Sequence, residues 1–103
     1  PCMFARRMKG IVEANHFTMD DTALVAAKAY ANGNLNPLAH MTKVKVSYDH
    51  ARTASEKNAN FLANEEFKNY LRLTDCSQVS DGAAAMILVS EQGAAKINAA
   101  KEK

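Results

Sequence analysis

Two cysteines and three histidines are the side chains in this 103-residue sequence best suited to nucleophilic or metal chemistry. His16, His40 and His50 share no ligand spacing with one another, nor with Cys2 or Cys76. Structural and catalytic metal sites draw their ligands from regularly spaced pairs of such residues. The sequence therefore predicts no metal site.

The two cysteines differ in their neighbours. Cys76 lies between Asp75 and an apolar run, and both would raise the pKa of its thiol and disfavour the reactive thiolate. We therefore expect Cys76 to be a packed small residue. Cys2 has Arg6 and Arg7 about one helical turn away, so it is either a somewhat acidified thiol or an incidental one.

A bend of small and polar residues, "DCSQVSDG" at positions 75–82, precedes the most apolar run of the chain. We expect this bend to approach a ligand. The hydroxyl of Ser77 could bond a ligand amide and leave room for it, or it could cap the turn at Ser80 and Asp81. Gly82 permits a positive φ and a close approach of a ligand or chain, or it serves turn geometry alone.

Two helices are predicted ahead of these residues. Apolar side chains at spacings of three and four make residues 3–15 an amphipathic helix. Thr18 with Asp21 resembles a capping box, so a second helix should begin there and end at Gly33. Positions 31–40, rich in Asn, Gly and Pro, predict an ordered turn.

The middle of the chain predicts short elements. Alternating residues at 43–47 and at 71–75 indicate two strands, the first at a sheet edge. Positions 48–61 are polar and predict a loop with at most a turn or two of helix and no packed core. Asn64 could cap a short helix through Tyr70.

The last third predicts a strand and a helix. The run "AAAMILV" at 83–89 is apolar throughout, as in a central strand that is covered on both faces, and Ser90 should cap a helix over 91–103. Three strands cannot make a buried sheet with helices on both faces. Together with a start at Pro1 that looks like a cut, this predicts an excerpt from a larger α/β protein.

Composition narrows the class of protein. The chain has 48% apolar and 23% charged residues and a net charge of +2, which is normal for a soluble globular domain. Its basic residues are scattered among acidic ones, so nucleic-acid binding is not indicated. Its longest apolar run is far too short to span a membrane. Two cysteines make no disulfide framework, which fits a reducing compartment.

Two strings resemble the thiolase family. "DCSQVSDGAAAMILVSEQGA" at 75–94 is similar to the end of the first half of thiolases, in the branch of acetyl-CoA acetyltransferases and sterol-carrier-protein-type thiolases. "ANGNLNPLAHM" at 31–41 resembles the Asn-Gly-x-x-Asn-Pro-x-Ala segment of their loop domain. The two occur in the expected order. The resemblance implies a partial α/β thiolase-like fold, with residues 1–71 a helix-rich loop-domain segment and 72–103 the last strand and helix of the N-terminal domain.

The resemblance also implies an activity. Thiolases are acyltransferases of lipid metabolism that join or cleave 3-ketoacyl-CoA, with a coenzyme A thioester as substrate and neither cofactor nor metal. Their nucleophilic cysteine lies upstream of the loop domain, and their Gly-His-Pro and Cys-x-Gly motifs would lie beyond Lys103. This chain should therefore contribute part of the coenzyme A site but no catalytic residue, and should be inactive alone.

Two site residues follow from the resemblance. Aligned on Asp81–Ala84, Ser77 corresponds to the serine that contacts the pantetheine arm of coenzyme A. Arg52 resembles, more weakly, an arginine near the nucleotide end, and is otherwise a solvated side chain. His40 and Met41 would lie near the acyl pocket.

Partners and compartment are also implied. We expect the remaining parts of a thiolase subunit, acyl-CoA, and assembly as a homodimer or homotetramer. A peroxisome or related organelle is expected, with cytoplasm or mitochondrion as alternatives. Two other functions stay open: a stand-alone acyl-CoA binding module, against which the incomplete sheet speaks, and a structural piece for oligomerisation. An unpaired edge on 83–89 would promote association.

Overall fold

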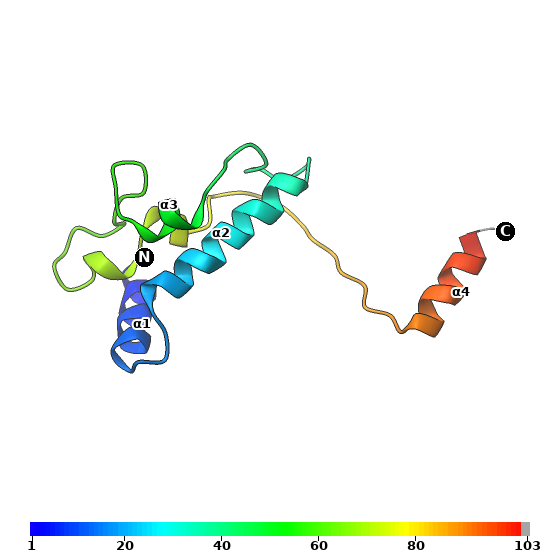
Figure 1. The fold of residues 1–103 in the computed structure, drawn as a ribbon, viewed down its shortest axis with the longest axis horizontal. Coiled ribbons are helices and arrows are strands. Elements are labelled where there is room, and N and C mark those ends of the chain that lie inside the picture. Colours follow the sequence, from blue (N-terminus) through cyan, green and yellow to red (C-terminus); the bar gives the residue numbers. More distant parts are fainter. Residues whose placement is uncertain (102–103) are drawn as a thin grey trace.

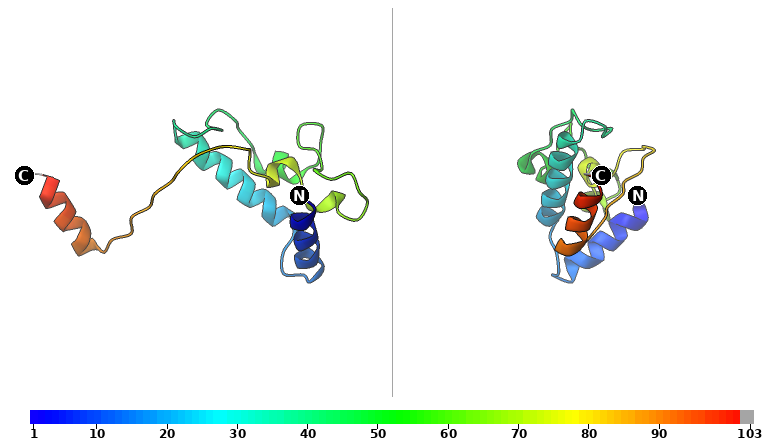
Figure 2. Two further views of the ribbon diagram at one scale, coloured as in Figure 1. Left: turned by 180° about the vertical axis from the view of Figure 1, so that it is seen from behind. Right: turned by 90° about the vertical axis from the view of Figure 1, so that its right-hand side faces the viewer.

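The computed structural model describes residues 1–101, which form helices joined by loops (Figure 1). We call residues 1–76 the body and residues 77–101 the arm. The body contains α1 (Cys2–Glu13), α2 (Met19–Leu35), α3 (Tyr48–Arg52) and two 3-10 turns, η1 (Lys68–Tyr70) and η2 (Leu73–Asp75); the arm ends in α4 (Glu91–Lys101). The arm leads away from the body, as Figure 2 shows from behind, and the molecule measures 63 × 32 × 24 Å.

The first predicted helix is confirmed as α1. It ends where Asn15 takes the left-handed conformation with φ 56°, which asparagine tolerates better than most residues. Ala5, fully buried, packs with Phe67 and Leu71 in one of two small apolar clusters of the body. The small side chain lets the loop around η1 come close to α1.

The predicted capping box of α2 is also confirmed. The Asp21 amide donates to Thr18 Oγ1 over 3.3 Å, and the Thr18 amide donates to Asp21 Oδ2 over 2.8 Å. The helix runs two residues past the predicted end at Gly33. Extended Asn36, which precedes Pro37, stops it, because the residue before a proline disfavours helical geometry.

The predicted edge strand at 43–47 is wrong. The segment begins in a turn and pairs with no other strand within the described range. Asn34 Nδ2 donates to the carbonyls of Thr42 (3.0 Å) and Val44 (2.8 Å), which holds this segment against the end of α2. Ser47 then caps α3 by accepting from the His50 amide over 3.1 Å.

The loop predicted over 48–61 does contain one short helix, α3, but the expectation of no packed core there is wrong. Ala51 is fully buried against α2, and Asn58 is fully buried beside it. Asn58 Nδ2 donates to the carbonyls of His50 (3.0 Å), Ala51 (3.1 Å) and Thr53 (3.3 Å), while Oδ1 accepts from the amide and hydroxyl of Thr74 (3.1 Å each). A side-chain amide with hydrogen-bond partners for its N–H groups and its oxygen can lie in a core, and a count of apolar residues in the sequence does not reveal such a core.

The predicted strand at 71–75 is wrong as well. Only Arg72 forms a single bridge, with Asn60, and η2 follows at once. The Asp75 carboxylate accepts from the Arg72 amide over 2.8 Å and closes that turn. Asn64 Oδ1 accepts from the Phe67 amide over 2.8 Å and so caps a turn, but the predicted helix through Tyr70 is only the 3-10 turn η1, which has no side-chain cap of its own.

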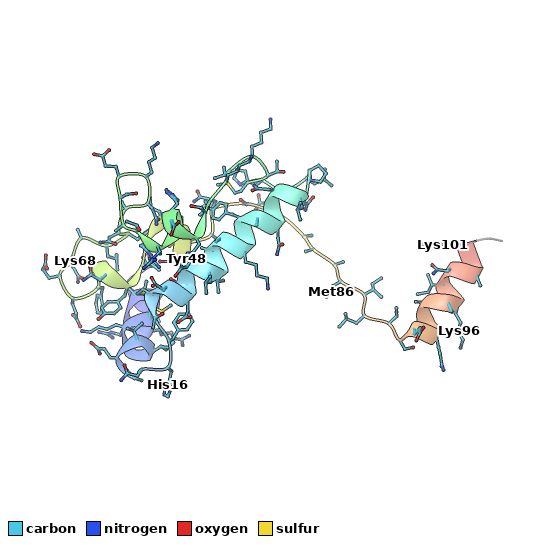
Figure 3. The ribbon with its side chains drawn as sticks, viewed as in Figure 1. His16, Tyr48, Lys68, Met86, Lys96 and Lys101 are labelled. Carbon is cyan, nitrogen blue, oxygen red and sulfur yellow. The ribbon has the colours of Figure 1, made fainter. Side chains whose placement is uncertain are left out.

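The predicted central strand at 83–89 is extended but has no partner strand among residues 1–101, so its predicted cover on both faces is not present there. Met86, Ile87 and Leu88 are 82–88% exposed, and Figure 3 shows Met86 well away from the body. Ser90 caps α4 as predicted, accepting from the Gly93 amide over 3.2 Å. The predicted helix end at residues 102 and 103 lies outside the described residues.

The backbone geometry at position 82 does not require a glycine. Its φ is not positive, and a Cβ placed there would meet no atom within 4 Å. The alternative of a positive φ is therefore wrong, and no other part of the described chain approaches this glycine closely. The α/β class and the division after residue 71 stay predictions, although Leu71 and Arg72 are buried within the body.

Candidate ligand-binding groove

An open groove of about 1490 Å³ runs along α1 and α2 and is bounded by the bend of the arm. The turn after α2 and residues 74–83 form its other walls. Both segments that carry the thiolase resemblance thus border the same groove.

One face of α2 forms the floor of the groove. Its lining residues recur at spacings of three and four, as one helix face requires: Thr22, Val25, Ala26, Ala29, Tyr30 and Gly33. Small side chains predominate here. They leave room for a ligand to lie along the helix.

One face of α1 forms a wall. Phe4, Arg7, Met8 and Ile11 line the groove, and their spacing again marks one helix face. Phe4 is 70% exposed, so this apolar face is open to the groove and not packed against another element of the described chain. The wall is apolar except for one arginine.

A side-chain contact joins the two segments that resemble thiolases, 31–41 and 75–94. His40 Nδ1 and Ser80 Oγ lie within hydrogen-bonding contact, with the donor set by the histidine tautomer. Both residues also line the groove. Since 40 residues separate them in sequence, this contact brings the bend of the arm to the turn that follows α2.

Ser77 lines the groove, and its contact with a pantetheine arm stays a prediction. Its side chain is exposed and makes no hydrogen bond within the described residues. The alternative, that it caps the turn at Ser80 and Asp81, has no hydrogen bond to support it there. The Ser77 hydroxyl is free to bond a ligand.

Arg52 does not line the groove. Its Nη2 lies 3.4 Å from Asp20 Oδ2, and its guanidinium lies over the ring of Tyr48 with 5.4 Å to the ring centroid. The structure does not bring Arg52 and Ser77 to one surface. The charge of Arg52 is already matched within the body.

A buried network of polar side chains lies beneath the groove and was not predicted from the sequence. We call Arg72, Asp75 and Thr22 the hub. The side chains of Arg72 and Asp75 are 5% and 6% exposed, with Nε 3.1 Å from Oδ2. Arg72 also donates over 2.6 Å each to the carbonyls of Arg52 and Met19 and to Thr22 Oγ1. The one available signal was the spacing of three between Arg72 and Asp75.

The Cys76 thiol is not poised as a nucleophile. Burial first, and then the negative charge of Asp75, raises its pKa above the ordinary value. A raised pKa keeps the thiol protonated at neutral pH. Cys76 packs beside the cluster of Ala5, Phe67 and Leu71, which confirms the expectation of a packed residue.

The described residues hold no group of three or more His, Cys, Asp or Glu side chains that is placed to bind a metal ion. Among the helices of residues 1–101, none is both long and apolar enough to cross a membrane. The chain matches no model of a known protein family, and no curated protein matches it.

Proposed function

We propose that this chain is part of a thiolase-type acyl-CoA acyltransferase, in which it supplies part of the coenzyme A site and no catalytic residue. One observation carries the proposal. Residues 31–41 and 75–94 resemble thiolases independently, and both reach one groove, where His40 contacts Ser80.

The proposed reaction, in the thiolytic direction, cleaves a carbon–carbon bond. A cysteine thiolate elsewhere in the subunit attacks the 3-keto carbon, the C2–C3 bond breaks, and acetyl-CoA leaves as its carbanion takes a proton from a second cysteine. The thiol of a second coenzyme A then gives its proton to a histidine and takes the acyl group from the first cysteine. The residues of this chain hold the substrate. Ser77 bonds the pantetheine arm with its free hydroxyl while the small side chains of α2 leave space beside it.

The arm has a separate role in this proposal. Residues 83–89 are extended and apolar on both faces, and no backbone hydrogen bond forms between residues 77 and 89 in the described chain. A strand of this type belongs inside a sheet. The remaining parts of the subunit would supply the neighbouring strands.

The test is thiolysis of acetoacetyl-CoA by the intact protein purified from its source. Cleavage to two acetyl-CoA is expected, and no activity from residues 1–103 alone. In the intact protein Ser77→Ala should raise KM for coenzyme A about two- to tenfold, the effect of one hydrogen bond, with little change in kcat. Ser77→Thr, which keeps the hydroxyl, is the matched control. An intact protein without thiolysis would refute the proposal.

A stand-alone acyl-CoA binding module is the second candidate. The groove favours it, because α1, α2 and the segment 74–83 together give it walls on several sides. Such a module would bind acyl-CoA as the isolated chain and would show no thiolysis in any form.

A further inference from the structure

The groove has one arginine among its lining residues, Arg7 on α1. We propose that Arg7, and not Arg52, holds the anionic phosphate end of an acyl-CoA whose pantetheine and acyl chain lie along α2. The choice of ligand rests on the proposed function. The choice of residue rests on the geometry of the groove.

Arg52 is unsuited to that task in this fold. Its guanidinium is committed to Asp20 and to the ring of Tyr48, and it does not border the groove. A phosphate at Arg52 would compete with a carboxylate that is already in place. It would also bind outside the groove that contains Ser77.

Arg7 has the opposite surroundings. It is exposed and makes no ion pair with an acidic side chain of the described residues. Its neighbours along the groove face of α1 are apolar: Phe4, Met8 and Ile11. A guanidinium beside an apolar wall matches a ligand with an anionic end and an apolar body, because it binds phosphate through two parallel hydrogen bonds.

The acidic residues of the groove fix the direction of the ligand. Asp75 is buried and paired with Arg72, so its charge is compensated. Asp81 lines the groove at the bend, beside the contact between Ser80 and His40 from the turn after α2. The anionic end should therefore lie at α1, away from Asp81, and the acyl end should lie toward His40.

The length of the floor suits such a ligand. The lining residues of α2 extend from Thr22 to Gly33, which corresponds to roughly 17 Å of helix at the usual rise per residue. Ser77 borders the same groove. A ligand that lies extended in the groove therefore has both Arg7 and this hydroxyl on the groove walls.

The experiment measures binding of octanoyl-CoA, coenzyme A and octanoate by calorimetry to the intact protein of the thiolysis test, after circular dichroism has established its helix content. Arg7→Gln, Arg52→Gln and the matched control Arg6→Gln are compared with the wild type. Arg6 adjoins Arg7 on α1 but does not line the groove. We expect Arg7→Gln to weaken octanoyl-CoA binding about five- to tenfold, as for one charged hydrogen-bonding contact near the surface, with no effect of Arg6→Gln.

Each other outcome decides a different point. Weakening by Arg52→Gln alone would overturn the assignment of Arg7 and leave the proposed function intact. Arg7-dependent binding of octanoate without coenzyme A binding would keep Arg7 as the anion site and count against the proposed function. Equal weakening by Arg6→Gln and Arg7→Gln, no binding, or a wild-type chain without helix would overturn the groove assignment itself.

Discussion

The body buries polar side chains and the arm exposes apolar ones, which is the opposite of the usual pattern. In the body the side chain of Arg72 is 5% exposed and Asn58 is fully buried, and both are bonded to several elements at once. In the arm Met86, Ile87 and Leu88 are at least 82% exposed. Local turns with polar partners can close within the body, whereas an apolar strand needs neighbouring strands to bury both faces.

The two regions also differ in how many hydrogen bonds hold them in place. The body binds its loops to α2 through Arg72 and connects α3 to η2 through Asn58. The contact between Ser80 and His40 is the only side-chain hydrogen bond between the arm and the body in the described chain. Changes in the body should therefore alter stability, and changes in the arm should alter association.

The largest effect is expected from Arg72→Met. This change leaves the buried Asp75 carboxylate without its cation, and such losses cost about 3–5 kcal/mol. Urea unfolding followed by circular dichroism measures the effect, with the exposed Arg6→Met as control. An unchanged unfolding midpoint would mean that the hub does not hold the body together.

Asn58→Ala should follow in size. The change strips three backbone carbonyls and Thr74 of their buried partner, at a cost of about 2–3 kcal/mol. The same unfolding experiment applies. Asn60→Ala, whose side chain makes no hydrogen bond in the described chain, should be nearly neutral, and equal losses in the two variants would contradict the account.

Removing the helix cap should have a smaller effect. Thr18→Ala should lower the free energy of unfolding by about 1 kcal/mol, since threonine caps α2. Thermal unfolding of the two proteins measures the difference. Thr53→Ala, which removes an exposed hydroxyl without a hydrogen bond in the described residues, serves as control. Equal melting temperatures for Thr18→Ala and the wild type would contradict the cap.

The cap also predicts a pH dependence. Hydrogen bonds from the Thr18 side chain, and next from its backbone, lower the pKa of Asp21 below the ordinary value. The stabilisation is therefore fully present above the unfolded pKa and is lost as pH falls through the folded pKa. Asp21→Asn should be less stable than wild type at neutral pH and equal to it in strong acid. A difference that persists in acid would exclude this origin.

The smallest effect on stability is expected in the arm. Met86→Lys should change the unfolding of the body by less than about 0.5 kcal/mol, because the side chain is exposed. It should nevertheless reduce self-association of the isolated chain, which sedimentation measures, since it places a charge on an apolar unpaired strand. A large loss of stability would show that the arm packs on the body.

The sequence predicted local features well where the signal was local. Thr18 with Asp21 and Ser90 cap their helices as expected, and Asn64 caps a turn, because each needs only a neighbour three residues away. The predicted strands at 43–47 and 71–75 were wrong. Asn34, from the end of α2, holds the backbone of the first segment. Asp75, three residues from Arg72, closes the second segment into a turn.

The site was predicted only in part for the same physical reason. Ser77 lies in the groove, but Arg52 is bound by Asp20, a partner 32 residues away that no local pattern reveals. Arg7 has no motif of its own and gains its place only from the packing of α1 beside the bend. Buried Asn58 and Arg72 resemble ordinary loop residues in the sequence.

The most direct test of the central claim is the intact mass and terminal sequence of the native polypeptide, taken from its source. The account predicts a longer protein, with a cysteine upstream of this chain and a Gly-His-Pro motif downstream. A native polypeptide that consists of residues 1–103 alone would contradict the thiolase proposal and leave binding by the groove as the function to test.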